Sequence, residues 1–254
     1  MRPMLVGNWK MNGDGTCLPV IAAIADAATR YPSVEVTLCP PATLLDRARS
    51  VAPTLGLGAQ DCDAEPDGAH TGDLSAAMLR EAGAGLVLLG HSERRHDHGE
   101  DDALIAAKLR TARAAGLRVL LCVGETAADQ AAGRSVAVVR EQLTRSLGGA
   151  AGPAIAIAYE PVWAIGSDRV PEPAEVAAIA DAIRDAFPGE GPPVLYGGSV
   201  TAGNGATLFA QAGIDGFLVG RQSLDADAFA AILEAMLSGS AARHRHAERG
   251  DGNR

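Results

Sequence analysis

The stretch RVLLCVGETAADQAAGRSVAVVREQLTRSLGGAAGPAIAIAY, residues 118–159, sets the pattern of the chain. It begins with a continuous apolar run (118–123), continues through a helical pattern (127–146) and ends on a second apolar run (154–159). Strands without polar alternation are typical of a parallel sheet that is covered on both faces. The stretch therefore predicts a strand–helix–strand unit with parallel strands.

The same alternation continues in both directions along the chain. Strands are predicted at 4–9, 34–39, 56–60, 86–90, 118–123, 154–159, 194–196 and 216–219. Helices are predicted at 17–30, 44–51, 75–81, 102–115, 127–146, 174–187, 203–212 and 226–237. Eight alternations favour a single α/β domain, a closed (β/α)8 barrel with a parallel eight-stranded core, over an open doubly wound sheet. An open nucleotide-binding sheet would also be expected to show GxGxxG after its first strand, where this chain has Gly7-Asn-Trp-Lys10.

Composition supports one globular domain and limits its partners. The 254 residues include 47% apolar and 21% charged residues, and one barrel of this class typically has ~250 residues. We expect the barrel to span residues 1–238 and a disordered basic tail to span 239–254. The net charge of −9 argues against general nucleic-acid binding. No apolar run reaches the ~18 residues that a membrane span needs, and no secretory signal is recognisable, so a cytoplasmic protein is expected.

Ionisable residues follow several of the predicted strands. Lys10 follows the first strand, His91 the fourth and Glu160 the sixth. Strands seven and eight end in glycine-rich turns, at Gly197-Gly-Ser199 and at Gly220, whose backbone N–H groups suit a phosphate. Because active sites of these barrels form where the strands end, the residues are expected to meet there. A carboxylate base, an imidazole that polarises a carbonyl and an ammonium that balances charge suit proton abstraction next to a carbonyl.

Seven motifs in order closely resemble those of the triosephosphate isomerase family. They are Gly7-Asn-Trp-Lys-Met-Asn12, Gly68-Ala-His-Thr-Gly-Asp73, Leu89-Gly-His-Ser-Glu-Arg-Arg95, Cys122-Val-Gly-Glu125, Tyr159-Glu-Pro-Val-Trp-Ala-Ile-Gly166, Tyr196-Gly-Gly-Ser-Val200 and Asp215-Gly-Phe-Leu-Val-Gly220. The resemblance covers the chain except its tail. It implies a TIM barrel that interconverts dihydroxyacetone phosphate and D-glyceraldehyde 3-phosphate through an enediolate. It also implies a homodimer in cytoplasmic carbohydrate metabolism (glycolysis and gluconeogenesis) and a small phosphorylated sugar as substrate.

The resemblance also implies roles for individual residues. It implies Glu160 as the base, His91 as the electrophile, Lys10 as the electrostatic residue and Glu93 as a supporting charge. The family is itself the standard example of a catalytic histidine that a helix N-terminus keeps neutral, and the resemblance carries this property to His91. Substrate contacts are expected from Asn8, Lys10, Gly166, Ser199, Gly220 and Arg221. Dimer contacts are expected from Met11, Asn12 and Thr71. The implied lid consists of Pro161, Val162, Trp163, Ala164, Ile165, Gly166, Ser167, Asp168, Arg169, Val170 and Pro171.

Two departures from the family pattern leave alternatives open. Arg221 stands where the family usually has a second glycine, and its side chain either points away or contacts the substrate. In the lid, Asp168 replaces a glycine and Pro171 stiffens the C-terminal hinge. These changes keep open an isomerase of a four-carbon ketose phosphate, such as erythrulose phosphate, with the same base and electrophile. A catalytically silent barrel that serves as a binding protein is the third alternative.

No cofactor or metal is expected. The segment His96-Asp-His98, followed by acidic residues, is interpreted as a solvated loop that leads into a helix. Cys122 is interpreted as a packing residue, and Lys108 as a surface or ion-pair residue. The four cysteines are scattered, which favours reduced thiols over a disulfide framework or a zinc site.

Overall fold

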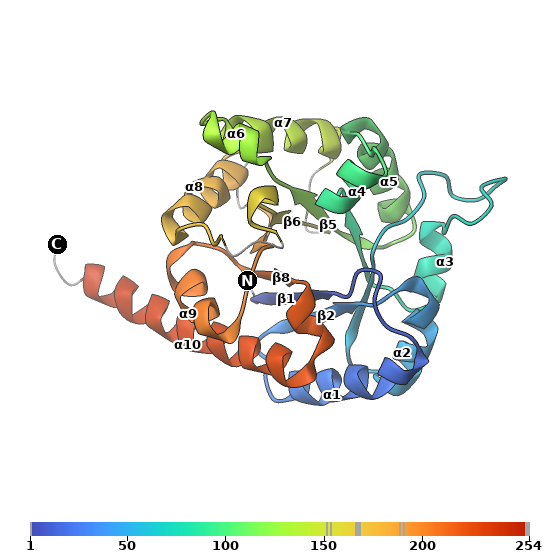
Figure 1. The fold of residues 1–254 in the computed structure, drawn as a ribbon, viewed down its shortest axis with the longest axis horizontal. Helices are drawn as coiled ribbons and strands as arrows, with labels where there is room; N and C mark the ends of the chain where they lie inside the picture. The colour runs from blue at the N-terminus through green and yellow to red at the C-terminus, as the bar shows by residue number, and fades with distance from the viewer. Residues whose placement is uncertain are drawn as a thin grey trace.

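The strands close into a parallel barrel. The computed structural model describes residues 2–150, 152, 154–165, 169–187, 189 and 191–251, with side chains described as far as residue 240. The strands are β1 (Met4–Asn8), β2 (Glu35–Cys39), β3 (Gly56–Ala59), β4 (Leu86–Leu89), β5 (Arg118–Val123), β6 (Ile155–Tyr159), β7 (Val194–Tyr196) and β8 (Gly216–Val219). They pair in chain order, and β8 returns to pair with β1 (Figure 1). The predicted fold class is confirmed.

Helices form the outer layer around the barrel (Figure 1). They are α1 (Leu18–Thr29), α2 (Leu45–Val51), α3 (Ala76–Glu81), α4 (Ser92–Asp97), α5 (Asp102–Ala114), α6 (Ala127–Ala131), α7 (Ser135–Leu147), α8 (Pro173–Arg184), α9 (Ala202–Gln211) and α10 (Ala226–Asp251). Short 3-10 turns are η1 (Gly15–Cys17), η2 (Ala42–Leu44), η3 (Val162–Ala164) and η4 (Arg221–Leu224). The single helix predicted over 127–146 is wrong. It divides at Gly133, whose φ of +67° favours glycine and ends α6.

Both faces of the strands are apolar because the barrel separates two cores. In β5, Leu120 and Cys122 face the interior of the barrel, whereas Val119, Leu121 and Val123 pack against the helices. The same alternation places Leu218 inside and Phe217 outside. Successive side chains of a strand point to opposite faces, so a strand that is buried on both sides must be apolar throughout.

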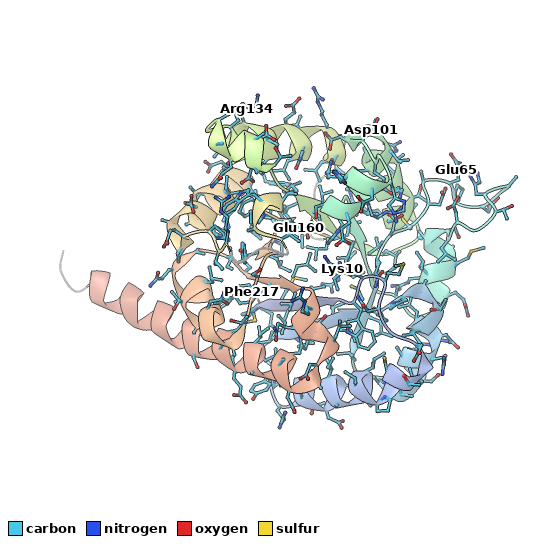
Figure 2. The ribbon with its side chains drawn as sticks, in the orientation of Figure 1. Lys10, Glu65, Asp101, Arg134, Glu160 and Phe217 are labelled. Atoms are coloured by element: carbon cyan, nitrogen blue, oxygen red, sulfur yellow. The ribbon has the colours of Figure 1, made fainter. Side chains whose placement is uncertain are left out.

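Closure of the barrel depends on a close backbone approach between its first and last strands. Met4 pairs with Gly216, and a Cβ at residue 216 would lie 1.9 Å from the carbonyl oxygen of Met4. No side chain fits at that distance, so glycine allows β8 to reach β1. Closure sets the C-terminal ends of all the strands around one rim, where Lys10 and Glu160 lie near the centre of the ring (Figure 2).

The last helix extends beyond its predicted end at residue 237. Gly239 is buried in α10, and a Cβ there would lie 2.5 Å from the carbonyl oxygen of Ala206 in α9. The helix therefore still packs on the barrel at the first residue of the predicted tail. The backbone of α10 continues to Asp251 (Figure 1). The disordered tail over 239–254 stays a prediction. Within the described residues, no helix is both long enough and apolar enough to cross a bilayer.

An ion cluster joins α5 to the segment after β3 and to the segment after α4. Lys108 is only 5% exposed, and its Nζ lies 2.7 Å from Asp61 and 2.5 Å from Glu100. The Arg94 guanidinium contacts the same two carboxylates at 2.9 and 2.7 Å. Burial raises the pKa of Glu100, but Lys108 and Arg94 more than offset this effect and leave that pKa below its usual value. Of the two roles predicted for Lys108, the ion pair is confirmed, and the surface position is wrong.

Replacement of Lys108 by alanine is expected to lower the free energy of unfolding by about 3 kcal/mol, because two carboxylates lose a buried partner. Urea denaturation followed by circular dichroism measures the change. Arg110→Ala, an exposed position of the same helix, is the control and is expected to cost less than about 0.5 kcal/mol. Equal effects of the two variants would contradict a structural role for the cluster.

Candidate active site

A cavity of about 820 Å³ opens at the C-terminal ends of the strands. Its lining includes Asn8 and Lys10 after β1, His91 and Glu93 after β4, and Glu160 after β6. The turns after β7 and β8 contribute Ser199, Gly220 and Arg221. The fold therefore brings together every predicted catalytic residue and every predicted substrate contact that lies within the described residues. Gly166 lies outside them.

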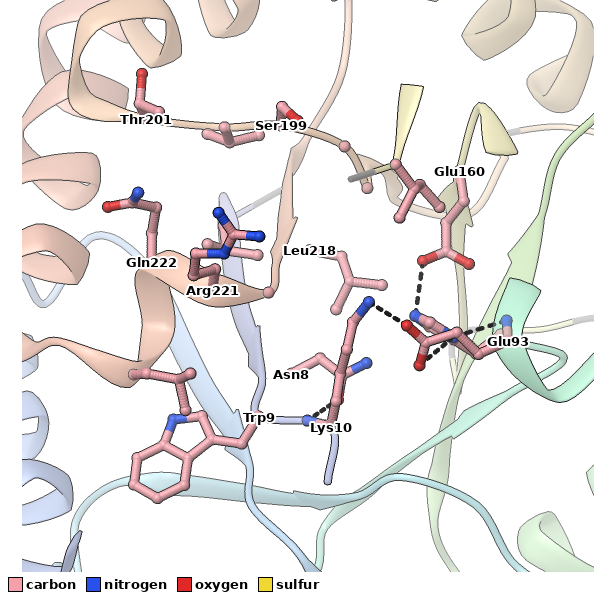
Figure 3. Close-up of a pocket in the computed structure, with 18 of the residues that line it drawn as sticks. Asn8, Trp9, Lys10, Glu93, Glu160, Ser199, Thr201, Leu218, Arg221 and Gln222 are labelled. Atoms are coloured by element: carbon pink, nitrogen blue, oxygen red, sulfur yellow. Dashed lines mark hydrogen bonds and ion pairs between the residues drawn. The ribbon is translucent and has the colours of Figure 1, made fainter. Parts of the chain in front are cut away.

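Glu160 is a buried carboxylate with its own positioning contacts. It is 4% exposed, and its backbone N–H donates to the carbonyl of Val123 at 2.8 Å, which continues the β5–β6 ladder by one residue. Its Oε2 accepts a hydrogen bond from the N–H of Ser92 at 3.2 Å. Its Oε1 lies 3.2 Å from Nε2 of His91 (Figure 3). The carboxylate is thus held against the first turn of α4.

His91 is fixed at the start of α4 in one tautomer. It is 5% exposed, and its Nδ1 accepts a hydrogen bond from the backbone N–H of Glu93 at 3.3 Å. A ring nitrogen that accepts such a bond carries no proton, so Nε2 is the protonated nitrogen. The Nε2–H group points at Glu160. The short helix expected to begin at His91 is confirmed, with His91 as its N-cap residue.

Lys10 has a strained backbone that its neighbours hold in place. Its φ of +52° lies in the left-handed region, which is uncommon for residues other than glycine. The side chain of Asn8 accepts from the N–H of Lys10 at 3.0 Å, and Gln60 donates to its carbonyl at 2.8 Å. The ammonium donates to Glu93 at 2.5 Å (Figure 3). These bonds offset the strain and direct the ammonium into the cavity.

The predicted lid begins in a fixed segment. Trp163 donates from Nε1 to Glu125 at 2.7 Å, and Tyr159 donates to the same carboxylate oxygen at 3.1 Å. Ile165 and Val170 line the cavity, and the guanidinium of Arg169 lies 4.6 Å from the ring centre of Trp163. Residues 166–168 lie outside the described residues. The two ends of the lid therefore border the predicted base.

Sequence reasoning missed three residues that position the site. Gln60 holds the Lys10 backbone, and Ser92 binds the Glu160 carboxylate. Gly124 packs so closely under the base that a Cβ would lie 1.7 Å from the carbonyl oxygen of Glu160. Gln60 and Gly124 directly follow β3 and β5, so a search of strand ends for uncharged residues would have selected both.

Cys122 faces the barrel interior beneath the site. Burial, together with the nearby charge of Glu160, raises the pKa of its thiol well above the usual value. The thiol therefore stays protonated and is unsuited to act as a nucleophile. Its interpretation as a packing residue agrees with its place in the interior core.

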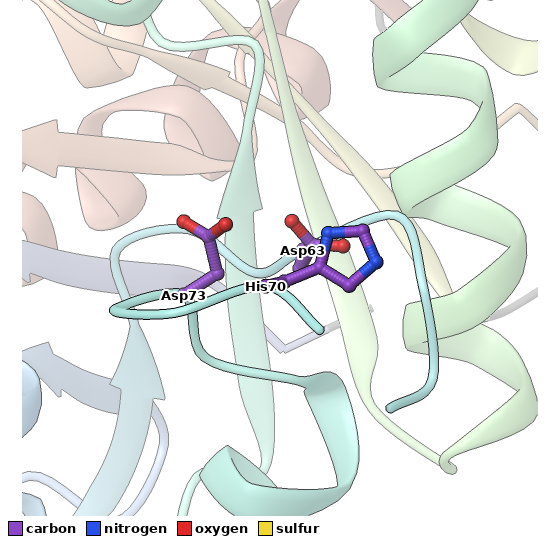
Figure 4. Close-up of side chains that lie close together, drawn as sticks. All are labelled: Asp63, His70 and Asp73. Carbon is purple, nitrogen blue, oxygen red and sulfur yellow. The ribbon is translucent and has the colours of Figure 1, made fainter. Parts of the chain in front are cut away.

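In the exposed histidine segment, His96 pairs with Asp97 at 2.6 Å. Among the described residues, Asp63, His70 and Asp73 of the β3–α3 connection have potential ligand atoms within 4.8 Å of one another (Figure 4). His70 and Asp73 are exposed, and this connection also holds the predicted dimer contact Thr71. Exposed groups of this kind commonly hold no metal, so we assign no metal here.

Fold and site together define a (β/α)8-barrel enzyme class with an acid–base site at the strand ends. The sequence matches the family described as triosephosphate isomerase over residues 3–236. The chain belongs to the triosephosphate isomerase family. The triosephosphate isomerase of Ruegeria sp. (strain TM1040) is 47% identical over 242 residues, covering 92% of this chain and 98% of the relative. That of Xanthobacter flavus is 48% identical over 244 residues, with the same coverage.

A solved structure gives the same result. The crystal structure of triosephosphate isomerase from Bartonella henselae superposes with a TM-score of 0.85 at 41% sequence identity. The alignment covers 92% of this chain and 99% of that one. The agreement therefore includes the whole barrel and not merely a local motif.

Gly124→Ala is expected to lower kcat about a hundredfold, because the new methyl group must displace the backbone of Glu160 and a shift of ~1 Å in a catalytic group has this order of effect. Steady-state kinetics on triose phosphates measures it, with circular dichroism as a check on folding. Gly85→Ala is the control, since the nearest atom to its Cβ would be the carbonyl oxygen of Leu57, at 3.9 Å. A wild-type kcat in Gly124→Ala would contradict the positioning role.

Proposed function

We propose that this chain interconverts dihydroxyacetone phosphate and D-glyceraldehyde 3-phosphate by proton transfer through an enediolate. The supporting observation is the pairing of a buried carboxylate with an imidazole whose Nδ1 accepts a backbone hydrogen bond and whose Nε2 faces that carboxylate. Glu160 Oε1 and His91 Nε2 lie 3.2 Å apart in a cavity that Lys10 also lines. Membership of the triosephosphate isomerase family supports the same reaction.

Glu160 acts as the base in this proposal. Its carboxylate removes a proton from the carbon next to the carbonyl of dihydroxyacetone phosphate. The electron pair of that C–H bond forms the carbon–carbon double bond of the enediolate, and the carbonyl oxygen takes the negative charge. A proton then passes from the hydroxyl on the first carbon to the charged oxygen on the second, and return of the proton from Glu160 to the second carbon gives the aldose phosphate. Because Glu160 Oε1 and His91 Nε2 are in direct contact at 3.2 Å, the carboxylate must move away from the imidazole for a substrate to enter between them.

His91 and Lys10 stabilise the developing charge. The Nε2–H group of His91 donates to the substrate carbonyl in place of Glu160 and polarises it. The ammonium of Lys10 attracts the enediolate oxygen. Glu93 contacts the Lys10 ammonium at 2.5 Å and thereby keeps that ammonium in position. No nucleophile is required, which agrees with the protonated state of the Cys122 thiol.

The phosphate group occupies the glycine-rich side of the cavity in this proposal. Ser199, Gly220 and Arg221 provide backbone N–H groups there, and Gly166 of the lid provides another on closure. Closure over the cavity excludes water from the enediolate and prevents loss of the intermediate. The borders of the lid at Ile165 and Val170 already line the cavity, which supports this role.

Triose phosphate is favoured over the alternatives. The relatives described above are named triosephosphate isomerase, so the comparisons do not favour a four-carbon ketose phosphate. The binding-protein alternative requires loss of a catalytic group, whereas Glu160, His91 and Lys10 all line one cavity.

We also propose a homodimer in a cytoplasmic setting. Met11, directly after Lys10, is 98% exposed, and Leu74 and Met78 are further exposed apolar side chains near Thr71. The β3–α3 connection that carries Thr71 projects from the barrel (Figure 1). An exposed methionine next to an active-site residue is expected to be covered by a second copy. The four cysteines are unpaired, which suits a reducing compartment.

Glu160→Asp is expected to lower kcat about a hundredfold with KM changed less than about threefold, because the shorter carboxylate sits ~1 Å from the proton it must remove. The coupled assay for triose phosphate turnover measures both constants. Glu81→Asp, at an exposed position of α3, is the control. An unchanged kcat would remove Glu160 from the role of base, and a wild-type chain without turnover would contradict the proposed reaction.

Met11→Asp is expected to shift the protein from dimer to monomer, because a charge replaces apolar surface at the proposed interface. Light scattering during size-exclusion chromatography measures the mass in solution. Val136→Asp, which adds the same charge at an exposed apolar position of α7, is expected to remain dimeric. A wild-type monomer at micromolar concentration would contradict the proposed dimer.

A further inference from the structure

The cavity contains an unusual distribution of positive charge. Lys10 and Arg221 are the lysine and arginine side chains that line it. The ammonium of Lys10 is held by Glu93 at 2.5 Å, so its charge is largely compensated. The side chain of Arg221 forms no ion pair or hydrogen bond with any described residue, and it is exposed. Arg221 is therefore the lining cation that pairs with no described carboxylate, whereas the ammonium of Lys10 is shared with Glu93.

The backbone that carries Arg221 is fixed. Arg221 begins η4 directly after Gly220, and Ser223 donates to the Gly220 carbonyl from both its N–H and its hydroxyl, at 2.8 and 2.7 Å. The indole of Trp9 donates to the carbonyl of Ser223 at 2.7 Å, and Ser223 is fully buried. The backbone therefore fixes the point from which the Arg221 side chain extends, and no described residue competes with a ligand for its guanidinium.

The guanidinium extends toward the side of the cavity proposed to hold phosphate. Figure 3 shows it directed from η4 toward the loop that carries Ser199 and Thr201, while Lys10, from the segment after β1, lies apart from it with Leu218 drawn between them. Gly220, the residue before Arg221, lies next to Lys10, since a Cβ at residue 220 would lie 3.6 Å from Cε of Lys10. Arg221 and Lys10 thus border the same cavity.

We propose that the guanidinium of Arg221 binds the phosphate group of the substrate directly and makes the phosphate subsite a strong site for free phosphate. The identity of the substrate in this inference rests on the proposed function. The binding of a free phosphate dianion by Arg221 does not depend on it. A guanidinium presents a planar fork of N–H donors that matches two phosphate oxygens. With Lys10 compensated by Glu93, Arg221 supplies the charge that offsets the dianion.

Three variants and two readouts test the proposal. Arg221→Ala removes the guanidinium, Arg221→Lys keeps a charge without the fork, and Arg110→Ala removes the same charge from the outer face of α5. Titration calorimetry measures the Kd of inorganic phosphate. Steady-state kinetics measures KM and kcat for glyceraldehyde 3-phosphate and kcat/KM for glyceraldehyde, which has no phosphate group.

Arg221→Ala is expected to raise the Kd of phosphate and the KM for the phosphorylated substrate about tenfold, the order of effect of one charge-assisted hydrogen bond. Its kcat/KM for glyceraldehyde is expected to change less than about twofold. Arg221→Lys is expected to lie between wild type and Arg221→Ala, and Arg110→Ala to match wild type. The proposal therefore predicts that Arg221→Ala weakens binding only of ligands that carry a phosphate group.

Two outcomes would overturn the proposal. One is a Kd and KM in Arg221→Ala within about twofold of the Arg110→Ala values, which would place the side chain in solvent only. The other is an equal loss with glyceraldehyde, which would indicate a distorted backbone rather than a lost phosphate contact. If the wild type binds phosphate but turns over no triose phosphate, the proposed function fails, and the calorimetric comparison alone still decides the role of Arg221.

Discussion

Hydrogen bonding between β8 and β1 is the constraint on which the remaining structure depends. It exists because Gly216 lets the backbone of β8 approach Met4 closely. An open sheet would spread Lys10, His91 and Glu160 along an edge, with Lys10 and the strand-eight turn at distant positions. Closure instead places β1 and β8 side by side, and Lys10 then faces the same cavity as the turns that follow β7 and β8.

Hydrogen bonds within the site then orient the side chains that barrel closure has brought together. The N-cap position of His91 leaves Nε2 protonated and aimed at Glu160. Asn8 and Gln60 hold the left-handed backbone of Lys10. Each of these contacts joins different parts of the chain, so the geometry of one catalytic group depends on several strand ends. Such mutual support keeps catalytic groups in place without substrate.

The cavity is lined both by residues of the family motifs and by Arg221, which lies outside those motifs. The carboxylate, imidazole and ammonium form the site that the family motifs imply. Arg221 is different, because it adds to the cavity a cation that no described carboxylate neutralises. Under the proposed function, proton transfer and phosphate binding use different groups on different strand ends, so one can change without the other.

The sequence by itself determined the barrel and predicted which residues meet at the C-terminal ends of its strands. Apolar runs with alternating helical patterns set the strands within one or two residues, because local periodicity and burial on both faces act over short stretches. Tertiary structure alone decided contacts between distant residues: Ser92 with Glu160, Gln60 with Lys10, and Gly124 beneath the base. It also decided that Lys108 is buried and that the Arg221 side chain lines the cavity. The burial of a side chain and the direction in which it points depend on which strands and helices become its neighbours. Local sequence patterns do not contain that information.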